Sequence, residues 1–364
     1  MMKVIGSPAW TLLVPILGLG TVGVLEIFHH GHPPAVLYLI AAPVLFGSVF
    51  AAVHHAEVIA HRIGQPFGSF LLAIAVTLIE VSLIVSMLLA DTSGGSSVAR
   101  DTVFAAIMIV LNGIVGLCLL IGGLRYHEQG FQPRGTSAAL GVLGTLAVLG
   151  LILPNYTEAI PGPVYAPEQL IFVAVISLVL YALFLFVQMV SHKSDFLEPV
   201  EPATIKDEGH VVSKAALVTA AIVLPVSLVV VVLLAEILAG PVRTAIVVAG
   251  LPEALVGVVI ALIVLMPEGL ASIKAAMQNR LQTSLNLAMG SVLASLCLTI
   301  PVVALVSVAM GETLVLGLDP EHIVLLVLTL FMSTLSLAMG RTTIMQGGIH
   351  LVIFGAFLTI AAIP

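Results

Sequence analysis

Apolar residues occur along this chain in blocks of about 18 to 25, separated by short segments rich in Gly, Pro and charge. A helix of that length can cross a hydrocarbon layer of about 30 Å. The pattern therefore predicts an all-α polytopic membrane protein with about eleven transmembrane helices. The expected spans are 8–28, 35–53, 68–90, 102–124, 138–153, 169–190, 212–236, 244–266, 284–309, 322–339 and 344–362. The first block is too long for a signal peptide, so we expect a retained helix.

One connection, 191–211, is long enough to divide the chain into two halves. Its charged side chains are mostly acidic: Asp195, Glu198, Glu201, Asp207 and Glu208 against Lys193 and Lys206. A solvated linker is the simpler interpretation of these acids, and a regulatory cation site is the alternative. The expected domains are an extra N-terminal helix in 1–34, a first five-helix repeat in 35–190, an acidic hinge loop in 191–211 and a second five-helix repeat in 212–364.

Composition excludes a soluble globular protein. Hydrophobic residues make up 60% of the chain and charged residues 9%, against about 25% charged residues in soluble domains. The net charge is -7 and no basic run occurs, so we expect no nucleic-acid partner. Cys118 and Cys297 both lie in apolar blocks and form no metal-binding spacing.

The basic residues predict how the chain is oriented in the lipid bilayer. With the N-terminus in the cytoplasm, the outer loops hold only Arg100 and Arg243, and the rest of the 12 basic residues fall on the inner side. This is the distribution that the positive-inside rule requires. An odd number of spans then places the C-terminus outside, and the hinge loop is cytoplasmic.

Two stretches of the chain resemble each other across the hinge. LAIAVTLIEVSLIVS (72–86) and NGIVGLCLLIGG (112–123) parallel VVIALIVLMPEGLAS (258–272) and SVLASLCLTIPVV (291–303). Glu80 matches Glu268, and Cys118 matches Cys297. The expected topology runs the two glutamate helices in opposite directions, so the repeats are inverted, as in many secondary transporters. Chance similarity between apolar helices is the alternative.

Glu80 and Glu268 are the leading candidates for a cation-binding and proton-binding site. A carboxylate at membrane depth costs about 2.5–3.5 kcal/mol on insertion scales, so it usually faces a partner or a water-filled cavity. Hard cations such as calcium prefer oxygen ligands, which two facing glutamates would supply. Glu268 falls just past the expected span 244–266, although the apolar pattern continues as GLASIKAAM. The alternative is a protonated carboxyl that bonds to neighbouring backbone.

Further oxygen ligands are expected around the two glutamates. Thr77 lies one turn before Glu80 on the same helix face. Pro267, directly before Glu268, would leave helix carbonyl groups free to bind a cation. Asn112 and Ser291 align between the repeats, and Asn286 precedes Ser291 on the same expected span.

Three more residues are expected to lie along the access path. Glu57 and His54 are placed near its inner mouth, and Glu253 near its outer mouth. A salt bridge with Arg243 is the alternative for Glu253. His54, His55 and His61 also admit a nitrogen-ligand metal site, but inner-rim histidines that titrate near neutral pH are favoured.

Several segments resemble the calcium/cation antiporter superfamily, specifically the calcium–proton exchanger branch with its bacterial Cha-type members. They are GGLRYHEQGF (122–131), AEVIAHRIGQPFG (56–68), LMPEGLAS (265–272) and NLAMGS (286–291). The resemblance implies alternating access around Glu80 and Glu268, in the inner membrane of a bacterium. The sequence departs from the Gly-Asn-Ala type of segment that precedes each glutamate in many relatives. Cha-type relatives are associated with sodium and potassium as well as calcium.

The sequence therefore predicts a secondary cation/proton antiporter, with calcium as the first substrate and sodium or potassium as alternatives. No cofactor is expected; the partners are the transported metal cation, protons and lipid, and a homo-oligomer is left open. A passive cation channel with the same glutamates is a second hypothesis. An intramembrane metalloenzyme built on the histidines is a third, although the chain has no HExxH motif. Hence we do not expect an enzyme.

Overall fold

The structure is a computed structural model of the whole chain, and it describes residues 3–4, 7–27, 35–63, 75, 77–82, 84–85, 97–199, 213–252, 254–311 and 313–363. In those residues nearly all regular structure is helical, and 10 helices are long and apolar enough to cross a membrane. The expected all-α polytopic architecture is confirmed. Of the expected span 68–90, the described residues 75, 77–82 and 84–85 are helical.

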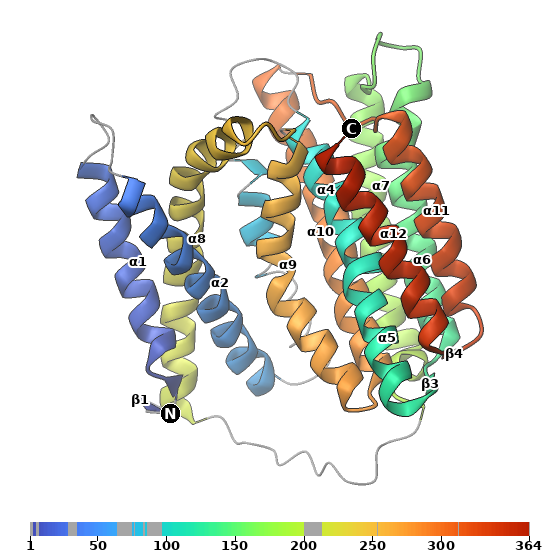
Figure 1. The fold of residues 1–364 in the computed structure, drawn as a ribbon, viewed down its shortest axis with the longest axis horizontal. Coiled ribbons are helices and arrows are strands. Elements are labelled where there is room, and N and C mark those ends of the chain that lie inside the picture. The colour runs from blue at the N-terminus through green and yellow to red at the C-terminus, as the bar shows by residue number, and fades with distance from the viewer. Residues whose placement is uncertain are drawn as a thin grey trace. The chain divides into compact units, whose positions relative to one another are not determined.

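The chain forms two compact units, each discontinuous in sequence. Unit 1 comprises Met1–Met87 and Ile205–Gly250, and unit 2 comprises Leu88–Thr204 and Leu251–Pro364. The named elements of unit 1 are β1 (Lys3–Val4), β2 (Ser7–Pro8), α1 (Trp10–Ile27), α2 (Ala35–Ile63) and α8 (Lys214–Val248). In this unit α2 packs against both α1 and α8 (Figure 1).

Unit 2 contains the remaining named elements, and Figure 1 shows most of them as a bundle of long helices. They are α4 (Val98–Met108), the π-helical turn η1 (Ile109–Ile114), α5 (Val115–Tyr126), β3 (Gln129–Gly130), α6 (Pro133–Ala147), η2 (Val148–Ile152), η3 (Leu153–Tyr156), α7 (Pro167–Phe186), η4 (Val187–Ser191), η5 (Lys193–Phe196), α9 (Ala254–Met277), α10 (Leu281–Met310), α11 (Pro320–Leu337), β4 (Arg341–Thr342) and α12 (Ile344–Ala362). The two short strands β3 and β4 pair antiparallel, with Gln129 opposite Thr342.

The core of unit 2 is formed by three helical spans. Among the candidate spans, the share of buried residues in the 18-residue apolar window is highest in Val98–Tyr126 (83%), Leu281–Met310 (67%) and Leu255–Met277 (59%). The helix α9 packs against α4, η1, α5 and α10. The outer helices of the unit carry large apolar side chains on their exposed faces, among them Phe172 and Phe331. Such faces suit contact with lipid, because a membrane-spanning helix needs an apolar surface toward the hydrocarbon.

The expected break between spans 212–236 and 244–266 is wrong. Gly240 and Pro241 predict a turn, but α8 continues through both residues to Val248. Neighbouring helices and small local adjustments make proline tolerable inside membrane helices. Figure 1 shows the last part of α8, in gold, bent relative to the rest, as a proline kink requires. The next helix therefore begins at Ala254, and Glu268 lies well inside it rather than past its end.

A close approach between α5 and α12 depends on glycine. A Cβ atom built on Gly347 would lie 2.4 Å from the backbone nitrogen of Leu120, and one on Gly116 would lie 3.0 Å from Cβ of His350. Small residues at such contacts let two membrane helices pack with their backbones close together. Because these residues are glycines, His350 of α12 lies directly against α5. The helix α5 continues the same span as η1.

Replacing Gly347 with alanine is expected to destabilise the protein by about 1–3 kcal/mol, the usual cost of overpacking a tight contact. The same replacement at the adjacent Gly348 is the matched control, because a Cβ there meets nothing within 4 Å. Thermal unfolding of both variants in detergent would test this. Equal melting temperatures for the two variants would contradict the packing described above.

Candidate functional site

Glu268 lies inside α9 and is buried, with 7% of its surface exposed. Pro267 directly precedes it within the helix, so the α9 backbone hydrogen bonding is interrupted next to the carboxylate. Ser272, one turn further along α9, is fully buried. The helix α9 thus presents a carboxylate and a hydroxyl on one face inside the core of unit 2.

Glu80 lies in unit 1 and is buried too, with 2% of its surface exposed. The described residues around it, 77–82, are helical. Thr77, Glu80 and Ile84 are buried while Leu78 is exposed, which places Thr77 and Glu80 on one buried helix face. The expected pairing of Thr77 with Glu80 on one face is therefore present in this helix.

Asn112 sits in the π-helical turn η1, at the centre of a fully buried polar network. Its Nδ2 donates to Thr329 Oγ1 of α11 at 2.9 Å, and its Oδ1 lies 3.0 Å from His350 Nδ1 of α12. The other ring nitrogen of His350 lies 3.2 Å from Ser336 Oγ of α11. The amide group of Asn112 therefore links η1 to α11 and α12. π-Helical turns are rare and are often found at functional sites.

This network was not found by the sequence analysis, although a signal was present. His350 is a titratable residue inside the apolar block 344–362, and polar residues at membrane depth are usually functional or paired. Thr329 and Ser336 lie in the apolar block 322–339 in the same way. The helices α11 and α12 follow each other along the chain, but Asn112 of η1 is 217 residues from Thr329 and 238 from His350, so only the fold brings Asn112 to them.

Asn286 binds the start of the acidic hinge. Its Nδ2 donates to the backbone oxygen of Phe196 at 2.6 Å, and its Oδ1 accepts from Gln282 Nε2 at 2.8 Å. Both polar atoms of the Asn286 amide thus have partners within unit 2. Ser291, one turn and a half further along α10, is partly buried.

Glu198 also holds the hinge against α10. Its Oε1 accepts hydrogen bonds from the backbone nitrogen and the hydroxyl of Thr283, each at 2.8 Å. A carboxylate here caps the free N–H groups of the first turn of α10 and faces the positive end of the helix dipole. The segment that we expected to be a solvated linker is therefore anchored to α10 at Glu198. The hinge residues from 200 to 212 lie outside the described residues.

The segment GGLRYHEQGF fastens the turn between α9 and α10. Gln129 Nε2 donates to the backbone oxygen of Ala276 and to Asn279 Oδ1, both at 3.0 Å. Tyr126 donates its hydroxyl hydrogen to the backbone oxygen of Met277 at 2.8 Å. Asn279 has a φ of 59°, a conformation that asparagine tolerates in tight turns. The segment therefore positions the end of the helix that carries Glu268.

The expected access-path residues divide between described and undescribed parts of the chain. His54 and Glu57 are partly buried on α2 in unit 1, and the rings of His54 and Trp10 lie 6.4 Å apart. The adjacent His55 is buried, with Nε2 3.3 Å from the backbone oxygen of Thr11. Glu253 lies outside the described residues.

The family comparison matches most of the chain. A family model described as "Sodium/calcium exchanger protein" matches residues 34–190 and 219–363. The first matched segment contains Glu80 and the second contains Glu268. The first ends at residue 190, where the expected first repeat ends, and the second ends at residue 363, next to the end of the expected second repeat at 364.

Individual proteins match over nearly the same length. The chain is 49% identical over 358 residues to y4hA of Sinorhizobium fredii, named as an ionic transporter, covering 98% of this chain and 97% of that protein. It is 36% identical to the sodium-potassium/proton antiporter ChaA of Escherichia coli, covering 88% and 87% of the two chains. The structure of native YfkE shares the fold, with a TM-score of 0.72 at 18% identity, over 97% of this chain and 100% of that one.

Proposed function

Because this chain belongs to the sodium/calcium exchanger protein family, we propose that it is a secondary antiporter that exchanges a metal cation for protons. The protein is a multi-pass membrane protein, and its family consists of ion transporters rather than enzymes. We propose that it resides in the bacterial inner membrane with its N-terminus in the cytoplasm and its C-terminus outside, as the distribution of basic residues indicates.

The observation that carries this proposal is the burial of Glu268 inside α9, behind a helix-interior proline. A buried carboxylate in a membrane is costly unless it binds a proton, a cation or another partner. Glu80 is buried in the same way on a helix of unit 1. From the match between the two glutamates in the sequence, we propose that both bind the transported cation or protons, with the hydroxyl oxygens of Thr77 and Ser291 as further ligands.

Exchange follows from competition for the same oxygen atoms. In the absence of a cation the carboxyl groups hold protons, because burial in a low-dielectric surrounding disfavours the charged form of a carboxyl group. A cation that enters from the cytoplasm displaces those protons and binds the carboxylates. The repeats then move so that the site opens to the other side, where protons replace the cation. Because the two ligands exclude each other, a proton gradient drives cation export.

Calcium is the proposed first substrate, with sodium and potassium as alternatives. Paired carboxylates and hydroxyl oxygens suit a hard cation such as calcium. YfkE, which shares the fold, is named as a Ca²⁺/H⁺ antiporter, whereas ChaA is named as a sodium-potassium/proton antiporter. The two names support the class of reaction and leave the three cations for the experiment to separate.

The remaining polar residues receive supporting roles in this proposal. We assign Asn112 to bracing η1 against α11 and α12, because both atoms of its amide are hydrogen-bonded there. We assign Asn286 to holding the hinge against α10 for the same reason. Glu57, His54 and Glu253 remain the proposed access-path residues.

Purified protein in proteoliposomes with an imposed proton gradient would test the function. Calcium, sodium and potassium are added separately while a trapped dye reports internal pH. We expect calcium to dissipate the gradient, and liposomes without protein to show no response. No response to any of the three cations, with correctly inserted protein, would overturn the antiporter proposal. Cation flux that is independent of the proton gradient would support a channel instead.

A further inference from the structure

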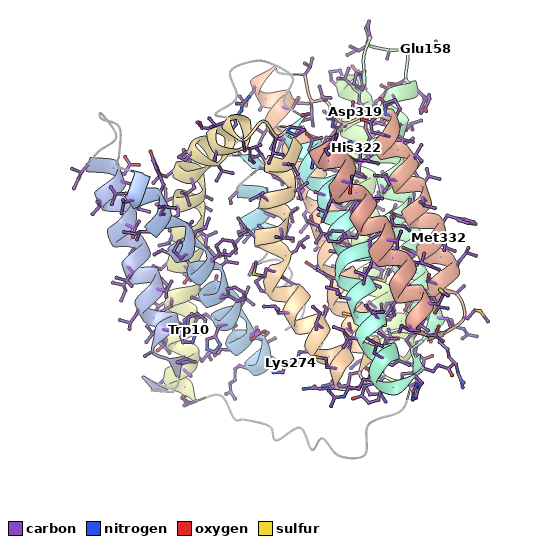
Figure 2. All side chains as sticks on the ribbon, viewed as in Figure 1. Trp10, Glu158, Lys274, Asp319, His322 and Met332 are labelled. Carbon is purple, nitrogen blue, oxygen red and sulfur yellow. The ribbon has the colours of Figure 1, made fainter. Side chains whose placement is uncertain are left out.

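At the start of α11, three potential metal ligands lie close together outside the proposed transport site. They are Asp319, Glu321 and His322, and one ligand atom from each lies within 4.8 Å of the others. Figure 2 labels Asp319 and His322 at this end of unit 2. The two carboxylates are exposed, while His322 is buried, with 8% of its surface exposed.

The ring of His322 is the buried member of this cluster, and its Nδ1 faces Asp319. Within the part of the chain that the structure describes, its Nδ1 is buried and accepts or donates no hydrogen bond. The same atom lies 3.9 Å from Asp319 Oδ2, too far for a hydrogen bond. The ring packs on Phe104 with the centroids 4.8 Å apart. A buried polar atom without a hydrogen-bond partner is destabilising, and coordination to a bound metal ion would remove that penalty.

The charged side chains around the cluster carry a net negative charge. Arg100 contacts Asp101 at 2.7 Å and Asp319 at 3.3 Å, and it donates to the backbone oxygen of Gly317 at 3.0 Å. The guanidinium of Arg100 is thus shared between Asp101 and Asp319, and Glu321 adds a third carboxylate beside Asp319. These three carboxylates and one guanidinium together carry a net charge of about -2, which a divalent cation would balance.

The backbone that carries the cluster is held in place. Leu318 N donates to the backbone oxygen of Leu151 at 2.9 Å, and Asn155 Nδ2 donates to the backbone oxygen of Leu318 at 3.1 Å. Tyr165 donates its hydroxyl hydrogen to the backbone oxygen of Leu149, and burial raises the pKa of this phenol to about 12, so it stays a donor. The residue before Asp319 is thus fixed, and the first turn of α11 follows from it.

We propose that Asp319, Glu321 and His322 form a binding site for a first-row transition dication such as zinc. One imidazole nitrogen and two carboxylate oxygens match zinc or manganese better than calcium, which prefers oxygen ligands alone. Zinc sites with three protein ligands complete a tetrahedron with water. Ligand atoms in such a site lie roughly 3.3 Å apart, and exposed carboxylates reach that spacing by rotating their side chains. The bound ion ties α11 to the loop that precedes it.

Zinc binding to the full-length protein, purified in detergent without a histidine tag, tests this site. Isothermal titration with zinc chloride and then calcium chloride is compared for wild type, His322→Phe and Asp319→Asn. Phenylalanine keeps the ring against Phe104, and asparagine is as well tolerated as aspartate at the N-cap position of α11, so both variants are expected to fold. We expect the zinc affinity to fall at least about tenfold in each. Glu158→Gln, an exposed carboxylate labelled in Figure 2, is the control and should bind as wild type does.

Melting temperature provides a second measurement that does not depend on transport. Zinc should raise the melting temperature of wild type and of Glu158→Gln, and the rise should disappear in His322→Phe and Asp319→Asn. Unchanged zinc affinity in both cluster variants, or no zinc binding by wild type, would overturn the proposal. Calcium that binds the cluster as tightly as zinc would overturn the choice of a transition metal.

Discussion

Glu268→Gln is expected to abolish cation-driven proton movement, lowering the exchange rate at least about 100-fold, because the charge of the ligands sets cation affinity over orders of magnitude. Glutamine keeps the size of the side chain but cannot carry a negative charge or release a proton. The residue is buried on α9, with 7% of its surface exposed. The measurement is gradient dissipation in proteoliposomes at several calcium concentrations.

Two further variants make this result specific. Glu268→Asp keeps the charge and the exchangeable proton, and we expect it to retain part of the activity with a weaker apparent calcium affinity. Glu168→Gln alters an exposed glutamate in the first turn of α7 and should leave exchange unchanged. Exchange at the wild-type rate by Glu268→Gln would refute the assignment of this residue to the transport site.

Glu80→Gln provides the matching test for the other proposed glutamate. If both glutamates bind the same cation, each single variant should already reach background, and the double variant should be no slower. Residues that act as one unit behave in this non-additive way. A substantial rate in Glu80→Gln, with Glu268→Gln at background, would place Glu80 outside the site.

Asn112→Ala is expected to destabilise the protein by about 1–3 kcal/mol for each buried partner left unpaired, here Thr329 and His350. Hydrogen bonds between membrane helices often contribute less than this, about 0.6 kcal/mol on average, so the network should fall toward the lower end. The measurement is chemical or thermal unfolding in detergent. A double-mutant cycle with His350→Ala should show a coupling energy of about 0.5–3 kcal/mol.

The same variants separate a bracing role of Asn112 from a ligand role. If Asn112 braces η1, Asn112→Ala and His350→Ala should lower stability alike while the apparent cation affinity of the folded protein changes little. A large drop in cation affinity in Asn112→Ala alone, with no loss of stability, would assign this amide to the transport site instead.

Much of the architecture could be predicted from the sequence, because membrane helices are determined by a local property. A span needs a sufficient length of apolar residues, and that length is visible along the chain. The blocks 102–124, 169–190 and 344–362 correspond to helices within a few residues of their expected ends. The break at Gly240 and Pro241 was wrong, because a turn signal in sequence does not show that packing tolerates a proline inside α8.

The candidate site, like the fold, could be predicted from the sequence only in part. The sequence alone marked Glu80 and Glu268 as candidates, because a carboxylate within or next to an apolar block is costly whatever its neighbours are, and the structure then placed Glu268 inside α9. Only the tertiary structure decided the partners of Asn112, Gln129 and Glu198 and the contact of Asn286 with Phe196, since those contacts join segments far apart in sequence. Hydrogen bonds between distant helices depend on side-chain directions and on close packing at glycines such as Gly347, which no local pattern encodes.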